Sequence, residues 1–156
     1  MHNSHYSIDT DPQRLDLRAI HAYLSRSYWS PGVSFDTVRR AVENSLSFGL
    51  YCEAASQPDT QASVQIGEQV GYARVITDKT TFAYLADVYV LEEHRGQGLS
   101  KRLIQAVQSH PDLQGLRRFL LATKDAHGLY AQFGFKALAN PTRMMEVLDP
   151  DAHLKH

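Results

Sequence analysis

The chain has 156 residues, close to the most common size for one hydrophobic core, so a single domain over 1–156 is predicted. Apolar residues make up 43% of the sequence and charged residues 21%, which excludes a mostly disordered chain. The formal net charge is −1, so the chain lacks the broad positive field with which proteins bind nucleic acids or anionic membranes non-specifically.

Short sequence features disfavour three further classes of protein. The most apolar stretch, 82–91, contains Asp87 and falls well short of the ~20 residues that span a bilayer. Residues 1–9 contain neither a basic segment nor an apolar core, so no secretory signal is expected and a cytoplasmic location is predicted. The single cysteine, Cys52, forms no intrachain disulfide, and with eight scattered histidines it builds no zinc quartet, so no metal is expected.

Two helices are predicted at the start of the chain. Apolar residues recur at helical spacing over 12–28, with either Asp11 or Asp16 as the N-cap. After the breaker Ser-Pro-Gly, Ser34 can cap a second helix, which we expect to end at Gly49.

The middle of the chain changes to strand-like composition, rich in Tyr, Val, Ile and Phe. Three strands are predicted over 49–55, 69–77 and 81–91. A polar turn over 57–63 separates the first two, and Asp78-Lys79 makes a tight hairpin between the last two. These strands therefore form an antiparallel meander.

A helix follows over 98–109 and then a strand over 118–123. A strand, a helix and a strand in this order form a crossover, so the segment 118–123 is expected to lie parallel to 81–91. The predicted fold class is therefore α/β (α+β), with a mixed, mostly antiparallel central sheet flanked by helices.

The C-terminal part predicts one more helix and a hairpin. The helix covers 126–133 and is ended by Gly134. Segments 135–138 and 144–148 then supply a final pair of strands.

The most informative segment is the glycine-rich turn between strand 81–91 and the following helix. Gly96 and Gly98 let backbone amides approach a ligand, and the helix N-terminus adds a positive partial charge. Arg95 adds a cation and Ser100 a hydroxyl, so the turn predicts an anion site, most simply for phosphate. The turn lacks the third glycine of the dinucleotide fingerprint and the Gly-Lys-Ser/Thr of a P-loop.

Two motifs resemble those of a known superfamily. Residues 95–100, Arg-Gly-Gln-Gly-Leu-Ser, resemble the Arg/Gln-x-x-Gly-x-Gly/Ala signature of the GNAT superfamily of acyl-CoA-dependent N-acyltransferases. Residues 128–135, Gly-Leu-Tyr-Ala-Gln-Phe-Gly-Phe, resemble its second signature. Ser100 departs from the usual Gly or Ala, and Gly128 stands where bulkier residues are common, at a helix-propensity cost of about 1 kcal/mol.

This resemblance implies that acetyl-CoA lies in a cleft between two splayed strands, without a metal. The backbone amides of the turn would hold its pyrophosphate, and strand 81–91 would pair with the amide-containing pantetheine arm as a further strand would. The residues implied to bind the cofactor are Val88, Val90, Arg95, Gly96, Gln97, Gly98, Leu99 and Ser100.

Transfer to a primary amine requires the neutral amine. A lysine-like amine is protonated at pH 7 by a ratio of about 2,500, equivalent to roughly 4.6 kcal/mol. Asp87, which interrupts an apolar strand, is the predicted general base, and the alternative is a structural carboxylate bound to a loop or an arginine. Glu53 is the reserve candidate, although a solvent-facing strand residue is the simpler interpretation. The resemblance implies that Tyr130 protonates the departing thiolate; a buried aromatic residue is the alternative.

The acceptor is expected to contact Tyr28 and Trp29, two aromatic residues beside a breaker that can form a rigid apolar wall for a cation. A core position for Trp29 is the alternative.

The predicted activity is N-acetylation of a primary amine on a small molecule or an exposed protein amino group, by direct attack in a ternary complex. A non-catalytic acetyl-CoA-binding module and a transferase for longer acyl chains are the other hypotheses. A homodimer through a sheet edge or the C-terminal hairpin is also considered.

Overall fold

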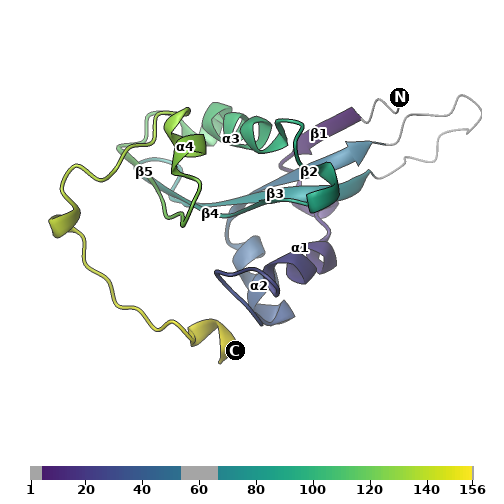
Figure 1. Cartoon of the computed structure of the whole chain (residues 1–156), viewed down its shortest axis with the longest axis horizontal. Coiled ribbons are helices and arrows are strands. Elements are labelled where there is room, and N and C mark those ends of the chain that lie inside the picture. Colours follow the sequence, from purple (N-terminus) through teal and green to yellow (C-terminus); the bar gives the residue numbers. More distant parts are fainter. Residues whose placement is uncertain (1–4, 54–66, 156) are drawn as a thin grey trace, which may run out of the picture.

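The computed structural model describes residues 5–53 and 67–155, and its centre is a five-stranded sheet (Figure 1). Its strands, in sheet order, are β1 (His5–Asp9), β2 (Leu46–Glu53), β3 (Glu68–Thr77), β4 (Phe82–Val90) and β5 (Arg118–Leu121). Strands β1 to β4 pair with one another in antiparallel fashion, and β5 runs parallel to β4. The predicted meander, crossover and mixed sheet are confirmed.

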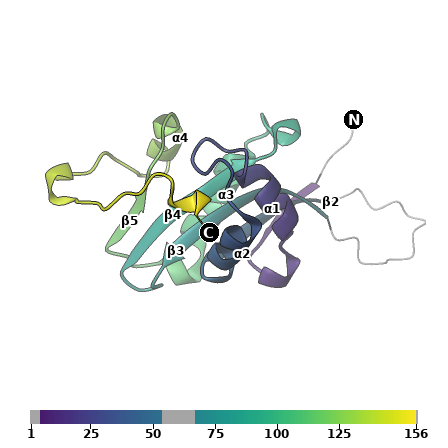
Figure 2. The same cartoon turned by 90° about the horizontal axis from the view of Figure 1, so that it is seen from below.

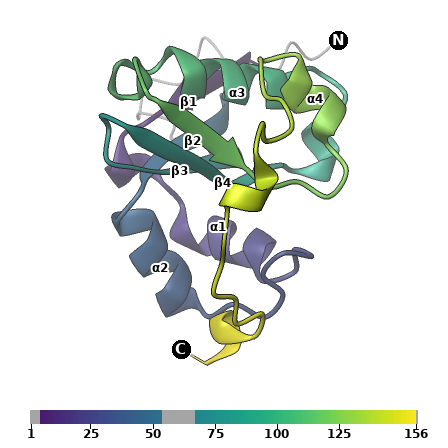
Figure 3. The same cartoon turned by 90° about the vertical axis from the view of Figure 1, so that its left-hand side faces the viewer.

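Helices cover both faces of this sheet (Figures 1 and 2). The four α-helices are α1 (Leu17–Leu24), α2 (Phe35–Glu43), α3 (Leu99–Ser109) and α4 (His127–Ala131). Helices α1 and α2 pack on one face, and α3 and α4 lie on the opposite side (Figure 3). Within the described segments, no helix is long and apolar enough to cross a bilayer.

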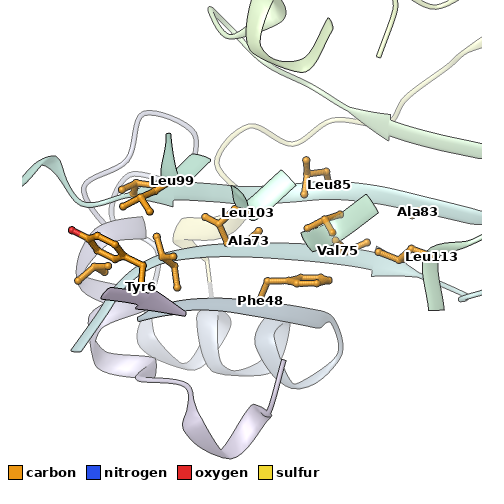
Figure 4. Packing of buried hydrophobic residues seen from close by; sticks show 13 residues of the cluster. Tyr6, Phe48, Ala73, Val75, Ala83, Leu85, Leu99, Leu103 and Leu113 are labelled. Atoms are coloured by element: carbon orange, nitrogen blue, oxygen red, sulfur yellow. The ribbon is translucent and has the colours of Figure 1, made fainter. Parts of the chain in front are cut away.

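The two faces bury separate groups of apolar side chains. Under α3, Phe48, Val75 and Leu85 of three strands meet Leu103 of the helix (Figure 4). On the other face, helices α1 and α2 cover a smaller cluster that includes two buried tyrosines of the sheet. Its buried members are Ile20, Leu24, Val33, Val38, Val42, Tyr72 and Tyr89. The sheet therefore has no solvent-facing side over its central strands.

The N-terminal helical region differs from the prediction because both candidate N-caps are used. Asp11 accepts a hydrogen bond from the Gln13 amide (3.0 Å) and starts a 3₁₀ turn, Pro12–Arg14. Asp16 accepts one from the Ala19 amide (3.0 Å) and starts α1, so the predicted helix 12–28 is divided in two. Helix α2 also ends earlier than predicted, at Glu43, because the chain from Leu46 pairs with β3.

The β3–β4 hairpin forms where it was predicted. The Asp78 carboxylate accepts hydrogen bonds from the amides of Thr80 (2.9 Å), Thr81 (2.7 Å) and Phe82 (3.1 Å). The Thr81 hydroxyl also donates to this carboxylate (2.6 Å), and that bond together with the three amides holds the pKa of Asp78 well below its usual range. The turn is therefore closed by its own side chain, as Asp does in tight turns.

The sequence patterns did not predict one strand that the structure contains, and they predicted two strands that it does not contain. Strand β1 was not expected, because only Tyr6 and Ile8 are apolar in it and its pairing partners lie 40 to 48 residues away in the sequence. The final hairpin is wrong, since 135–148 contains no strand in the structure. Helix α4 is shorter than the predicted 126–133. The predicted turn 57–63 lies outside the described residues.

Gly49 is the position in the sheet where an added methyl group would collide most severely. A Cβ atom there would stand 2.3 Å from Tyr51 Oη and 2.5 Å from Tyr51 Cζ, and the Tyr51 side chain is fully buried. We expect Gly49→Ala to lower the free energy of unfolding by about 1–3 kcal/mol, as overpacking does. Urea denaturation followed by far-UV circular dichroism measures this loss.

Gly128→Ala is the matched control for that substitution. Gly128 lies in α4, and a Cβ atom there would meet nothing within 4 Å. The higher helix propensity of alanine should stabilise the fold by up to about 1 kcal/mol. Equal losses from Gly49→Ala and Gly128→Ala would contradict the steric explanation.

Candidate acyl-CoA and acceptor site

The site lies where β4 continues beyond its parallel partner. Strand β5 pairs with β4 only from Phe82 to Leu85, and β4 then runs on to Val90 without β5 beside it. A cavity of about 560 Å³ opens at this divergence and is lined by Val88, and a second of about 170 Å³ is lined by Val90. Both cavities therefore lie along the same stretch of β4.

The smaller cavity is formed by the glycine-rich turn and the first turn of α3. Gly96 and Gly98 adopt left-handed conformations, with φ of +82° and +74°, and Gly98 is the N-cap of α3. No side chain caps this helix end, so its first amides are available to a ligand. Leu99 and Ser100 also line the cavity. The turn thus presents backbone donors and a helix N-terminus to one space, which suits an anion.

Two polar side chains of the turn are hydrogen bonded to the surrounding scaffold. The Arg95 guanidinium donates through Nε to the Val90 carbonyl (2.9 Å) and through Nη2 to the Tyr23 hydroxyl (3.1 Å). The Gln97 amide donates to the Tyr6 hydroxyl (3.1 Å) on β1. These bonds fix the turn to β4, α1 and β1. Because Arg95 and Lys101 also line the small cavity, an anion there would meet two cationic residues in addition to the backbone amides.

The larger cavity holds the predicted catalytic and acceptor residues together. Asp87 and Tyr130 line it, and Tyr28 and Trp29 form one of its walls. Burial raises the pKa of the Tyr130 phenol above its usual value, and nearby Tyr28 adds to the rise. The phenol therefore keeps its proton over a wider pH range than a free tyrosine does.

Asp87 is held by two partners in this cavity. One carboxylate oxygen accepts from Trp29 Nε1 at 2.8 Å, and the other accepts from Arg74 Nε at 2.8 Å. The Asp87 and Arg74 side chains are only 11% and 15% exposed. The sequence analysis missed Arg74, although it is a polar residue interrupting an apolar strand, the same signal that singled out Asp87. The arrangement makes Asp87 a link between the acceptor wall and β3.

We expect Asp87→Asn to lower the free energy of unfolding by about 2 kcal/mol. The substitution leaves the Arg74 guanidinium without its counterion, at a cost below the ~3–5 kcal/mol of a fully buried pair because both groups keep some exposure. Urea denaturation measures the loss. Emission of Trp29, the single tryptophan of the chain, should also shift as its charged acceptor is removed.

The control is the double variant Arg74→Gln/Asp87→Asn, which removes both charges. It should regain part of the stability lost in Asp87→Asn, because no unpaired charge remains. If the loss of unfolding free energy in the double variant equals the sum of the losses in Arg74→Gln and Asp87→Asn alone, the ion pair does not couple these two residues.

A third cavity, of about 640 Å³, borders the same aromatic wall. It shares Tyr28, Trp29 and Asp125 with the 560 Å³ cavity, and its other acidic members are Glu92 and Glu93. Arg26 and Arg95 supply its positive charges, and Arg95 is already hydrogen bonded. Aromatic rings beside carboxylates are typical surroundings for a cation.

Glu53 lies apart from these three cavities. Its carboxylate accepts from the Ser7 hydroxyl at 2.7 Å and forms an ion pair with Arg14. The hydrogen bonds from Ser7 and Arg14 lower the pKa of Glu53. Its surroundings are those of a structural link between β1, β2 and the Pro12–Arg14 turn. Among the described residues, no group of His, Cys, Asp and Glu side chains could hold a metal ion.

Comparison with known proteins identifies the family of this chain. The model of the acetyltransferase (GNAT) domain family matches residues 59–137. The "Putative acetyltransferase" of Gibberella zeae is 37% identical over an alignment of 137 residues, which covers 81% of this chain and 76% of that protein. The chain belongs to the GNAT family of acetyltransferases.

Solved structures agree on the fold. The crystal structure of "a putative acetyltransferase belonging to the gnat family" from Xanthomonas campestris is 47% identical, with a TM-score of 0.85 and 96% of each chain covered. N-acetylglutamate synthase from Neisseria gonorrhoeae, solved with coenzyme A and N-acetylglutamate, is 14% identical, with a TM-score of 0.61. That match covers 88% of this chain and 30% of the synthase and shows the fold alone. The protein is therefore an acyltransferase of this family.

Proposed function

We propose that the protein transfers the acetyl group of acetyl-CoA to a primary amine by direct attack in a ternary complex. The observation that carries the proposal is the placement of two cavities along β4. One presents the amides of the glycine-rich turn, and the other contains Tyr130 and the aromatic wall. A pyrophosphate in the first cavity would direct the thioester of the same molecule toward the second.

The glycine-rich turn and β4 would bind the cofactor together. The amides from Gly96 to Ser100 would hold the pyrophosphate at the start of α3. Val88 and Val90, beyond the reach of β5, would pair through their backbone with the pantetheine arm. Arg95 and Gln97 would contribute by holding the turn in place, as their hydrogen bonds indicate.

In the transfer, the neutral amine nitrogen attacks the thioester carbonyl carbon, the C–N bond forms and the C–S bond breaks. Tyr130 would donate its phenolic proton to the departing thiolate. The attacking nitrogen releases one proton as the amide forms, and the phenolate would regain a proton from solvent. Positioning and exclusion of water supply much of the acceleration, because the thioester is already activated.

The contacts of Asp87 support a positioning role rather than proton abstraction. Both of its oxygens are already hydrogen bonded, so it would have to release Trp29 or Arg74 to accept a proton. With Asp87 occupied in this way, the amine would lose its extra proton to solvent before attack. The rate should then rise with pH as the neutral fraction of the acceptor grows.

The surroundings of Tyr28 and Trp29 support an amine as the acceptor. Glu92, Glu93 and Asp125 line the cavity on one side of this wall and would attract an ammonium group. Lys124 Nζ already lies 5.4 Å from the centroid of the Tyr28 ring, so the ring of Trp29 would stabilise the ammonium further, by about 0.5–2 kcal/mol.

Two measurements test the proposal. Isothermal titration calorimetry with CoA should show saturable binding, and release of free thiol from acetyl-CoA should depend on an added amine from a panel of small amines and peptides. An absence of CoA binding at millimolar concentration would overturn the proposal. Tight binding without turnover on any amine would instead support a non-catalytic module. Competition among acyl-CoA thioesters of increasing chain length tests the preference for acetyl.

A further inference from the structure

We propose that Lys124 accepts the acetyl group of acetyl-CoA bound to the same chain, which makes this residue a site of self-acetylation. Self-acetylation rests on the proposed function, because it uses the same cofactor and the same cavity. It adds an acceptor that belongs to the protein itself. The observation behind it is a lysine amine that lies against the wall where the acceptor amine is proposed to bind.

Lys124 lies on the loop that joins β5 to α4 (Figure 1). It lines the cavity of about 560 Å³ together with Tyr130, the proposed proton donor. The loop is fixed at the start of α4, because the Thr123 hydroxyl accepts a hydrogen bond from the Ala126 amide (3.0 Å). Tyr130 lies in that helix. One short stretch of chain therefore brings the lysine and the phenol to the same cavity.

The Lys124 ammonium occupies part of the aromatic wall. Its Nζ atom lies 5.4 Å from the centroid of the Tyr28 ring. Tyr28 also neighbours Tyr130, since burial first and then the nearby Tyr28 raise the pKa of the Tyr130 phenol. An acceptor ammonium is proposed to bind this same wall, so Lys124 occupies the place of the acceptor with a primary amine of its own.

The amine of Lys124 is less constrained than those of other lysines in the chain. Lys79 and Lys155 form ion pairs with aspartates, whereas Lys124 forms none with the residues that the structure describes. Of the five lysines, Lys124 alone lines the cavity that contains Tyr130. A cation–π contact of an exposed side chain is weak, so the amine can leave the ring and lose its proton to solvent.

The transfer follows the same chemistry as transfer to an added amine. The neutral Nζ attacks the carbonyl carbon of the thioester, the C–N bond forms and the C–S bond breaks. The nitrogen releases one proton to solvent, and the thiolate takes a proton from Tyr130, which regains one from solvent. Because the nucleophile already lies in the cavity, no acceptor has to be bound first. Each chain reacts once, since the amide product is no longer nucleophilic.

The first test is incubation of the full chain with acetyl-CoA and no added amine. Release of free thiol should stop after about one equivalent per chain, because the single internal acceptor is then used up. Intact-mass spectrometry should show one added acetyl group, and peptide mapping should place it on Lys124. The rate constant should not depend on protein concentration. It should fall when a good amine substrate is added, because that amine competes for the same wall.

Two matched variants separate this site from general lysine reactivity. Arginine keeps the positive charge beside Tyr28 but does not accept an acetyl group, so Lys124→Arg should lose both the label and the equivalent of thiol. Lys136 is exposed and lines none of the three cavities, so Lys136→Arg should still be labelled at Lys124. In the folded protein, Lys124 should react about tenfold or more faster than Lys136. In urea the two should react equally.

Three outcomes would overturn self-acetylation while leaving the proposed function intact. The first is turnover of added amines with Lys124 unmodified. The second is equal labelling of Lys124 and Lys136 in the folded protein, and the third is a rate constant that rises with protein concentration. An absence of CoA binding would overturn both proposals, and calorimetry with CoA on the same sample identifies that case.

Discussion

Tyr130→Phe is expected to lower kcat by about a hundredfold with both KM values nearly unchanged. General acid catalysis commonly contributes 10²–10⁴-fold, and the lower end applies because a thiolate is already a good leaving group. The phenol lines the cavity in which transfer is proposed, and phenylalanine keeps its edge-to-face contact with Phe135. Steady-state kinetics with acetyl-CoA and the best amine measure the effect.

A selenoester of CoA distinguishes proton donation from packing. Its selenol is more acidic than a thiol, so it departs with less need for a proton, and the loss in Tyr130→Phe should shrink several-fold with this donor. Tyr28→Phe is the control, because Tyr28 shares the cavity and is 59% exposed; its kcat should fall less than about threefold. An equal loss with both donors would refute the acid role of Tyr130.

The second large effect is expected from alanine at Gly96 or Gly98. Both residues have positive φ, where a Cβ atom costs about 1–2 kcal/mol. If the turn relaxes to relieve this strain, its amides no longer converge on the small cavity. We expect the dissociation constant for CoA to rise tenfold or more for each variant, since every ~1.4 kcal/mol is a factor of ten. Calorimetry with CoA measures it.

Gly115→Ala is the matched control for backbone strain. Gly115 has φ of +68°, and a Cβ atom there meets nothing within 4 Å, as at Gly96 and Gly98. It precedes β5 and lines none of the three cavities. Its alanine variant should lose a similar free energy of unfolding and keep its affinity for CoA. Weakened CoA binding in Gly115→Ala would mean that strain alone explains the result.

Local features of the fold were predictable because they depend on neighbouring residues. The Asp78-Lys79 hairpin follows from a carboxylate that bonds to the next amides, and α3 begins directly after Gly98. The crossover from β4 to β5 follows from the order of the elements and the handedness of such connections. These parts of the site depend on turn chemistry and periodicity.

Pairings over long distances in the chain were not predictable in the same way. Strand β1 exists because β2 supplies its hydrogen bonds, not because its own residues favour a strand. Conversely, 144–148 has the composition of a strand, but the end of its own chain lies beside Pro31 and Gly32 rather than β5. The composition of a segment indicates its preference for the strand conformation. Whether the segment forms a strand depends on a neighbouring strand that can pair with it.

By itself, the amino-acid order predicted the family motifs, the mixed sheet and the glycine-rich turn before α3, since these follow from glycine conformations and from the spacing of apolar residues. Only folding brings the side chains of Trp29, Asp87 and Arg74 into hydrogen-bonding contact, although Trp29 and Asp87 are 58 residues apart in the sequence. It also turned the side chains of Arg95 and Gln97 toward the scaffold. Side-chain partners depend on how strands and loops meet in space, which no short window of sequence records.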